Sequence, residues 1–151
     1  KCTCSQGQIK NYLGRISKPL LDRIDIFTET IILKYGEISN SDKGENSYNV
    51  RKRIEKVHHI QKERYKNDGI LFNSELSAGI IKRYCVMDNE AKEYLENIFE
   101  NMEFSARAYH KVLKTARTIA DMDESGEIKR KHISEAVCYR TADKKYWGVT
   151  M

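Results

Sequence analysis

Phe104-Ser-Ala-Arg-Ala-Tyr-His-Lys-Val-Leu-Lys-Thr-Ala-Arg-Thr-Ile-Ala-Asp121 is a strongly helical pattern within this chain of 151 residues. Its second residue, Ser105, is of a type that caps helix N-termini. Its apolar side chains recur three and four positions apart, at Tyr109, Val112, Leu113, Ala116, Ile119 and Ala120. That spacing places them on one face of an α-helix, and such a face must be buried against other elements. The stretch therefore predicts a helix that packs into a bundle.

Further helical patterns lie on both sides of this stretch. They cover a long basic helix from Ser47 to about Lys66, one from Ser74 to Tyr84, one that starts at Asp88, and one from about Lys131 to Thr141. On the long helix, Val50, Ile54, Val57 and Ile60 form the predicted inner face. From about residue 73 onward we expect a compact helical bundle.

The chain begins differently. Ser5 and Gln8 form a capping-box pattern at the start of a short helix, and Pro19 opens a single turn. Ile24 to Leu33 alternates in a way that is typical of a strand, yet no second strand follows for it to pair with. The expected fold is mainly α: a helical bundle preceded by a short helix and one orphan strand. We expect three parts, at residues 1–34, 35–72 (a linker and the long basic helix) and 73–145.

Composition is consistent with a folded domain, since 40% of the residues are hydrophobic and only one is proline. The net charge of +5 permits a phosphate-bearing partner without requiring one. No apolar run approaches a membrane span, and the cysteine spacing is not that of a disulfide framework, so we expect a cytoplasmic protein. The sequence opens on Lys1, which suggests a piece of a longer protein. No phosphate-binding G-x-x-x-x-G-K-[ST] loop occurs, so we expect the chain to be inactive alone.

Four strings resemble the magnesium-chelatase-like family of AAA+ ATPases, in the family's order. They are Cys2-Thr-Cys-Ser5 with Arg15-Ile-Ser-Lys-Pro-Leu-Leu-Asp-Arg-Ile-Asp-Ile26, the Phe104–Asp121 stretch, and Ile128-Lys-Arg-Lys-His-Ile-Ser-Glu-Ala-Val-Cys-Tyr-Arg140. The resemblance is greatest to the ComM-type competence branch. It implies that residues 1–34 close an ATPase core and that the bundle is the AAA+ lid. It also implies ATP, Mg²⁺ and a ring, a hexamer, in the parent ATPase.

Arg23 matches the family's arginine finger, which reaches the γ-phosphate of a nucleotide on the neighbouring subunit. Arginine suits this task because its planar, permanently charged fork binds phosphate oxygens in pairs. The alternative from the residues alone is an ion pair with Asp22 or Asp25. Arg107 matches the sensor-2 arginine, which contacts the nucleotide of its own subunit, and the alternative is an ordinary exposed arginine. Arg117 is expected to serve packing or a salt bridge.

Cys2 and Cys4 do not make a zinc site by themselves, because tetrahedral zinc needs four ligands. Relatives carry a Cys-Pro-Cys-Gly string shortly upstream. The resemblance therefore implies that Cys2 and Cys4 are half of a possible Zn²⁺ site that is completed outside this chain.

Three functions stay open at this point. The first is the lid and arginine-finger segment of an ATPase that remodels DNA, with ComM-like branch migration as the model. The second is a subunit of a true magnesium chelatase, and the third is a stand-alone basic helical module that binds nucleic acid. DNA is the expected partner, and the basic helix from Ser47 to Lys66 is a candidate surface for phosphate contacts, although basic helices are usually just solvated.

Overall fold

A computed structural model describes residues 3–36, 44–102 and 104–147, with side chains described as far as residue 140. The helices are α1 (Gln6–Leu13), α2 (Lys18–Leu21), α4 (Ser47–Tyr65), the 3₁₀ turn η1 (Asn73–Glu75), α5 (Ala78–Tyr84), α6 (Asn89–Asn101), α7 (Ala106–Met122) and α8 (Arg130–Trp147). The prediction of a mainly helical fold is confirmed. None of the described helices is both long and apolar enough to cross a membrane.

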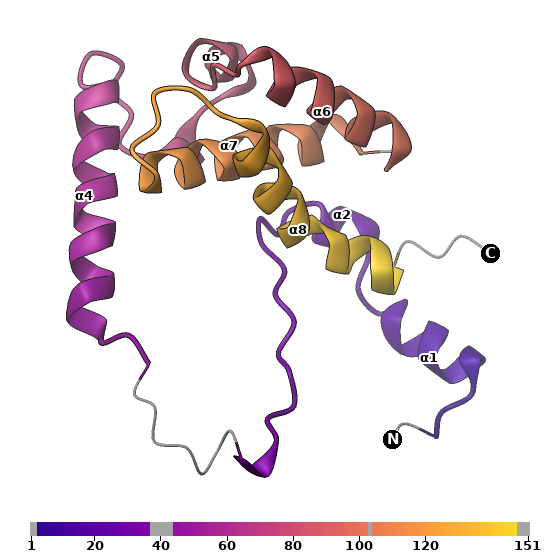
Figure 1. The fold of residues 1–151 in the computed structure, drawn as a ribbon. Coiled ribbons are helices and arrows are strands. Elements are labelled where there is room, and N and C mark those ends of the chain that lie inside the picture. Colours follow the sequence, from indigo (N-terminus) through magenta and orange to yellow (C-terminus); the bar gives the residue numbers. More distant parts are fainter. Residues whose placement is uncertain (1–2, 37–43, 103, 148–151) are drawn as a thin grey trace.

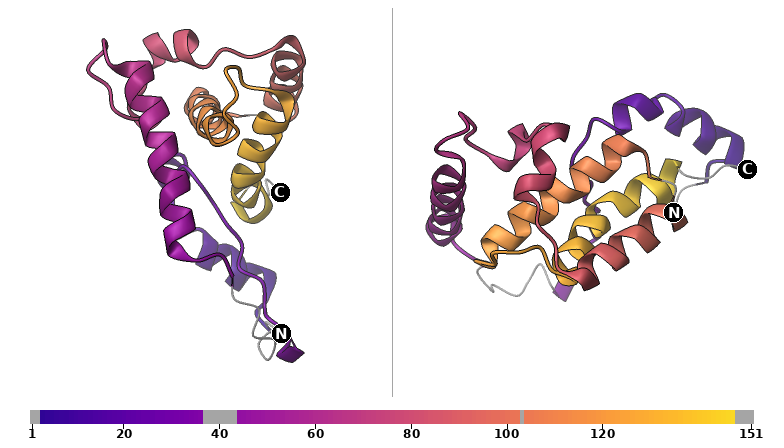
Figure 2. Two further views of the ribbon diagram at one scale, coloured as in Figure 1. Left: turned by 60° about the vertical axis from the view of Figure 1, so that its left-hand side comes forward. Right: turned by 90° about the horizontal axis from the view of Figure 1, so that it is seen from above.

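Helix α7 lies at the centre of the bundle and packs against α8, α4, η1 and α5, while α6 packs on α8 (Figure 1). Viewed from above, α6, α7 and α8 lie side by side (Figure 2). The apolar face predicted for α7 is the core: Val112, Leu113, Ala116 and Ala120 are all buried. Ser105 caps α7 as expected, because its Oγ accepts the N–H of Ala108 at 3.1 Å.

Other predicted helix starts also hold. The Ser5–Gln8 capping box is present at α1, and Asp88 caps α6 by accepting the N–H of Ala91. Two predictions need correction. Asn46, not Ser47, caps α4, and the single helix predicted from Ser74 to Tyr84 is two short elements.

Leu76 separates those two elements. It adopts ψ 122° and its side chain is buried, so the chain leaves the helical conformation there to place an apolar group in the core. A short parallel bridge between Met87 and Ile128 then ties the loop before α6 to the loop before α8.

The predicted orphan strand is not formed. Residues 24–34 carry neither helix nor strand, and Figure 1 shows them as a thread that leaves α2. One of their links to the bundle is the N–H of Phe27, which donates to the carbonyl oxygen of Tyr139 at 2.9 Å. A strand needs a neighbouring strand for its hydrogen bonds, and no described residue provides one.

The buried face of helix α4 differs from the predicted one. Its buried residues are Val57, Gln61 and Tyr65, whereas Ile54 is exposed. The reason is visible in Figure 1: only the C-terminal half of α4 meets the bundle, and the N-terminal half extends away from it.

Candidate functional site

A hollow of about 560 Å³ opens where residues 23–25 meet η1, α5 and the start of α7. Its charged or ionisable lining residues are Arg23, Asp25, Arg107, His110, Lys111 and Lys114. The two arginines that the sequence assigned to phosphate chemistry, 84 positions apart in the chain, therefore share one cavity. Four permanent cations against one carboxylate make the hollow suitable for an anion.

Helix α7 places most of these side chains. Residues 107, 110, 111 and 114 are three or four positions apart, so they share one face of the helix. The opposite face carries Val112 and Ala116 into the core, which fixes the direction of the charged face. Arg107 lies in the first turn, next to the cap Ser105.

The cations of the hollow differ in what they bind. Lys111 Nζ donates to the carbonyl oxygen of Arg23 at 2.7 Å and forms an ion pair with Asp25. Lys114 Nζ donates to the carbonyl oxygen of Ser74 at 2.8 Å. By contrast, the exposed guanidinium groups of Arg23 and Arg107 form no hydrogen bond or ion pair with any described residue. Two cationic side chains are therefore left available for a ligand.

The alternative interpretation of Arg23, an ion pair with Asp22 or Asp25, is not what the structure shows. Asp25 is paired with Lys111, and Asp22 accepts from Ser105 Oγ at 3.5 Å and lies 4.0 Å from an Arg140 nitrogen. Both carboxylates thus face groups of the bundle instead of Arg23.

Arg117 is a structural residue, as predicted. It is 1% exposed, pairs with Asp121 at 3.0 Å and donates to the carbonyl oxygen of Gly126 at 2.8 Å. Burial lowers the pKa of its guanidinium, and the charge of Asp121 opposes that shift. An arginine so enclosed by protein groups cannot reach the hollow.

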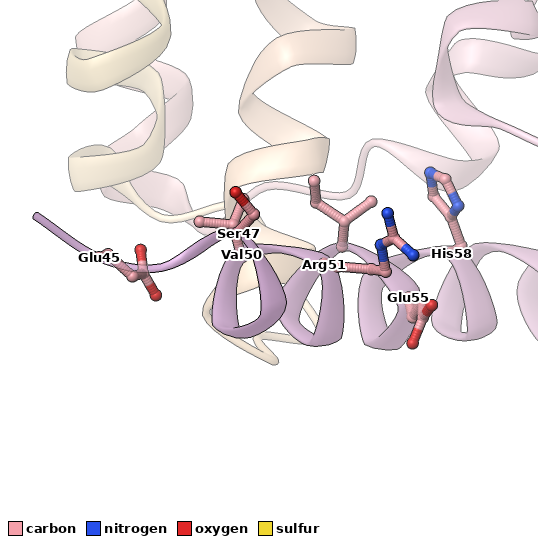
Figure 3. A pocket seen from close by; sticks show the side chains of 7 residues that line it. Glu45, Ser47, Val50, Arg51, Glu55 and His58 are labelled. Carbon is pink, nitrogen blue, oxygen red and sulfur yellow. The ribbon is translucent and has the colours of Figure 1, made fainter.

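A second hollow of about 520 Å³ runs along the exposed half of α4, where Figure 3 shows Glu45, Arg51, Glu55 and His58. All of its lining comes from α4 and the residues just before it, so no second element converges on it. Its two glutamates offset its arginine. This hollow lacks the concentration of cations found beside α7.

The proposed zinc half-site is only partly visible. Cys4 is exposed and forms no disulfide, and Cys2 lies outside the described residues. Within the described part of the chain, no three His, Cys, Asp or Glu side chains are grouped to hold a metal ion. The assignment of Cys2 and Cys4 therefore stays a prediction.

Sequence reasoning missed His110, Lys111 and Lys114 as members of the site. The signal was present, because these residues follow Arg107 at helical spacing on the polar face of α7. What could not be read from that spacing is that residues 23–25, far away in the chain, lie against the same face.

Comparison with known proteins identifies relatives along almost the whole chain. Residues 1–38 match the family model described as magnesium chelatase, subunit ChlI, and residues 44–140 match the model for the ChlI C-terminal part. The competence protein ComM of Haemophilus influenzae is 39% identical over 137 residues, which are 90% of this chain and 26% of that protein. The uncharacterized protein YifB of Salmonella typhimurium is 37% identical over 93% of this chain and 27% of its own length. The chain thus spans about a quarter of these relatives.

Proposed function

The chain belongs to the magnesium chelatase ChlI family, and from this membership we propose that it forms the lid and arginine-finger segment of an ATPase that remodels DNA. The observation that carries the ATPase part is the hollow beside α7, where Arg23 and Arg107 are both exposed and both lack a described protein partner. A triphosphate is the ligand that matches two free guanidinium forks held beside two further cations.

The proposed roles divide as follows. Arg23 is an arginine finger for a nucleotide held by a neighbouring subunit of a ring. The resemblance assigns Arg107 to the nucleotide of its own subunit. Because both arginines line one hollow of one chain, we propose that Arg107 contacts the same nucleotide as Arg23, that of the neighbouring subunit, in place of the own-subunit contact that the resemblance implies. Such contacts stabilise the charge that develops on phosphoryl oxygens in the transition state.

Mg²⁺ would accompany the nucleotide and neutralise phosphate charge. The residues of the hollow do not fit a metal ion, because its one carboxylate, Asp25, is already paired with Lys111. We therefore assign this chain a role at the phosphates and none in holding Mg²⁺.

The test is ATP hydrolysis by the complete protein that carries this chain. Arg23→Ala and Arg107→Ala should each lower kcat, by up to about 10³-fold for Arg23, because finger arginines contribute on the order of 10³–10⁵ in rate. Arg23→Ala should leave nucleotide affinity nearly unchanged. Arg130→Ala is the matched control, since this exposed arginine pairs with Glu90 away from the hollow. Equal loss of nucleotide binding and turnover in Arg23→Ala would contradict the finger role.

DNA is the proposed partner because of α4. Residues 47–66 contain seven Lys or Arg and two Glu, so their net charge of +5 equals that of the entire chain. Most of these cations lie on the exposed surface of α4, and half of the helix extends from the bundle. A projecting cationic helix suits a phosphate backbone.

Magnesium insertion into a porphyrin is the second candidate, because the family description names a magnesium chelatase. The two candidates make different predictions for the complete protein. Stimulation of ATP hydrolysis by branched or duplex DNA, with no response to a porphyrin, would support DNA remodelling. The reverse pattern would support a chelatase.

A further inference from the structure

The chain at Arg23 is held by the bundle and not by its own local structure. Helix α2 ends at Leu21, and beyond it residues 24–34 have no regular structure. From α7, Lys111 Nζ donates to the carbonyl oxygen of Arg23 at 2.7 Å and pairs with Asp25. The Lys111 side chain is only 15% exposed, whereas the carboxylate side chain of Asp25 is 69% exposed.

Helix α8 holds the next positions of the same segment. The guanidinium of Arg140 donates to the carbonyl oxygen of Ile24 and lies 5.2 Å from the centre of the Phe27 ring. The N–H of Phe27 donates to the carbonyl oxygen of Tyr139 at 2.9 Å. Two successive carbonyl groups, those of Arg23 and Ile24, therefore each accept from a cation of the bundle, while the Arg23 side chain itself stays exposed.

We propose that Lys111 is a positioning residue for Arg23, so that the bundle sets where the arginine of its own chain points. The proposal rests on the proposed function of Arg23 as a finger. An exposed arginine on an irregular segment samples many directions, and fixing its backbone removes the main-chain part of that freedom before the phosphate arrives.

The same helix also carries Arg107, one turn before Lys111. A phosphate that draws Arg107 moves α7, and α7 holds the backbone of Arg23 through Lys111. The two arginines are thereby mechanically linked: a shift of the lid relative to the ATPase core displaces both. Lys111 is the only described side chain of α7 that joins the helix to the backbone of Arg23.

Lys114 provides a matched control for this proposal. It lies on the same face of α7, lines the same hollow and carries the same charge, yet it donates to the carbonyl oxygen of Ser74 and not to residues 23–25. Lys111→Met and Lys114→Met thus remove equal charge from the hollow, and only the first removes the contact with Arg23. Lys111→Arg keeps a cationic donor.

The experiment measures kcat, nucleotide affinity and hydrogen exchange of residues 22–27 in the complete protein. We expect Lys111→Met to lower kcat roughly 10- to 100-fold, the range for a misplaced catalytic group, with nucleotide affinity within about threefold of wild type. Exchange at the Phe27 amide should accelerate. Lys111→Arg should restore most of the rate, and Lys114→Met should leave the exchange of residues 22–27 unchanged, because Lys114 donates to Ser74 and not to this segment.

Equal acceleration of exchange at residues 22–27 in Lys111→Met and Lys114→Met would overturn the proposal, because it would show a general charge effect and not the loss of one contact. Unchanged exchange of residues 22–27 in Lys111→Met would overturn it as well. The finger role is judged separately. If Arg23→Ala retains full turnover while Lys111→Met still accelerates exchange of residues 22–27, Lys111 does hold this segment, but the proposed function of Arg23 is wrong.

Discussion

Asp121 is a charged residue whose side chain has no exposed surface. Its carboxylate forms ion pairs with Arg64 of α4 and with Arg117 of its own helix, and it accepts from Asn73 Nδ2 at 2.9 Å. Arg64 is also bound to Asn73, at 3.3 Å. One carboxylate thus joins α4, η1 and α7 at a single point. A buried charge is tolerated only when all of its partners are in place.

Replacing Asp121 should be costly for this reason. We expect Asp121→Asn to lower the free energy of unfolding by about 3–5 kcal/mol, because Arg117 would be left as a buried charge without its counter-ion. Chemical denaturation monitored by circular dichroism measures the change. The control is Glu124→Gln, which breaks an exposed pair with Lys56 and should cost no more than about 1 kcal/mol. Similar midpoints for Asp121→Asn and wild type would contradict this account.

Helix α4 shows how one element can serve two purposes. Its C-terminal half supplies Val57, Gln61 and Tyr65 to the bundle, and Tyr65 Oη donates to Asn73 at 2.5 Å. Its N-terminal half contacts little of the bundle, although Lys56 reaches Glu124 at 2.6 Å. The helix is therefore anchored through its C-terminal half, while most of its Lys and Arg side chains stay exposed along its length.

A salt titration of DNA binding tests the role of this surface. Lys52→Gln with Lys62→Gln should weaken binding and reduce the slope of log K against log salt by roughly 2, because each phosphate contact releases about one counter-ion. Lys82→Gln with Lys92→Gln is the control, since these exposed lysines lie on α5 and α6. Fluorescence anisotropy with a duplex oligonucleotide gives both slopes. If the slope of log K against log salt is the same in the two double variants, α4 is excluded as the surface that contacts DNA.

At the scale of the whole molecule, the elements of the bundle pack around α7 and bury Cys85 between them. Its side chain is 4% exposed, and its Sγ lies 3.8 Å from the carbonyl oxygen of Leu113, which it contacts as a donor. Burial raises the pKa of this thiol to about 11. Folding therefore favours the protonated thiol, whereas the unfolded chain releases the proton at its ordinary pKa near 9.

The consequence is a loss of stability at high pH. The contribution of Cys85 is fully present below pH 9 and disappears as the pH rises toward 11, because ionisation then favours the unfolded chain. Comparing wild type with Cys85→Ala cancels the titration of other groups. The stability advantage of wild type at pH 7.5 should shrink by pH 10.5, as measured by chemical denaturation. An advantage that is independent of pH would show that Cys85 ionises normally in the folded protein.

The sequence by itself determined the helical elements and several of their ends. Periodic apolar residues on α7, the caps at Ser105 and Asp88, and the capping box at Ser5 are local signals, and each depends on residues a few positions apart. Arg23 and Arg107 were also recognisable, because family resemblance is carried by short strings such as Leu20-Leu-Asp-Arg-Ile-Asp25.

Only the tertiary structure decided what those elements and arginines face. The inner face of α4 begins at Val57 and not at Val50, because burial depends on where the bundle ends and not on helical periodicity. The predicted strand lacks a described partner, since a sheet is made by contacts between segments. Likewise, Lys111 reaches the backbone of Arg23 from 88 positions away. Contacts over such separations arise from the packing of whole elements, and no local pattern in the sequence encodes them.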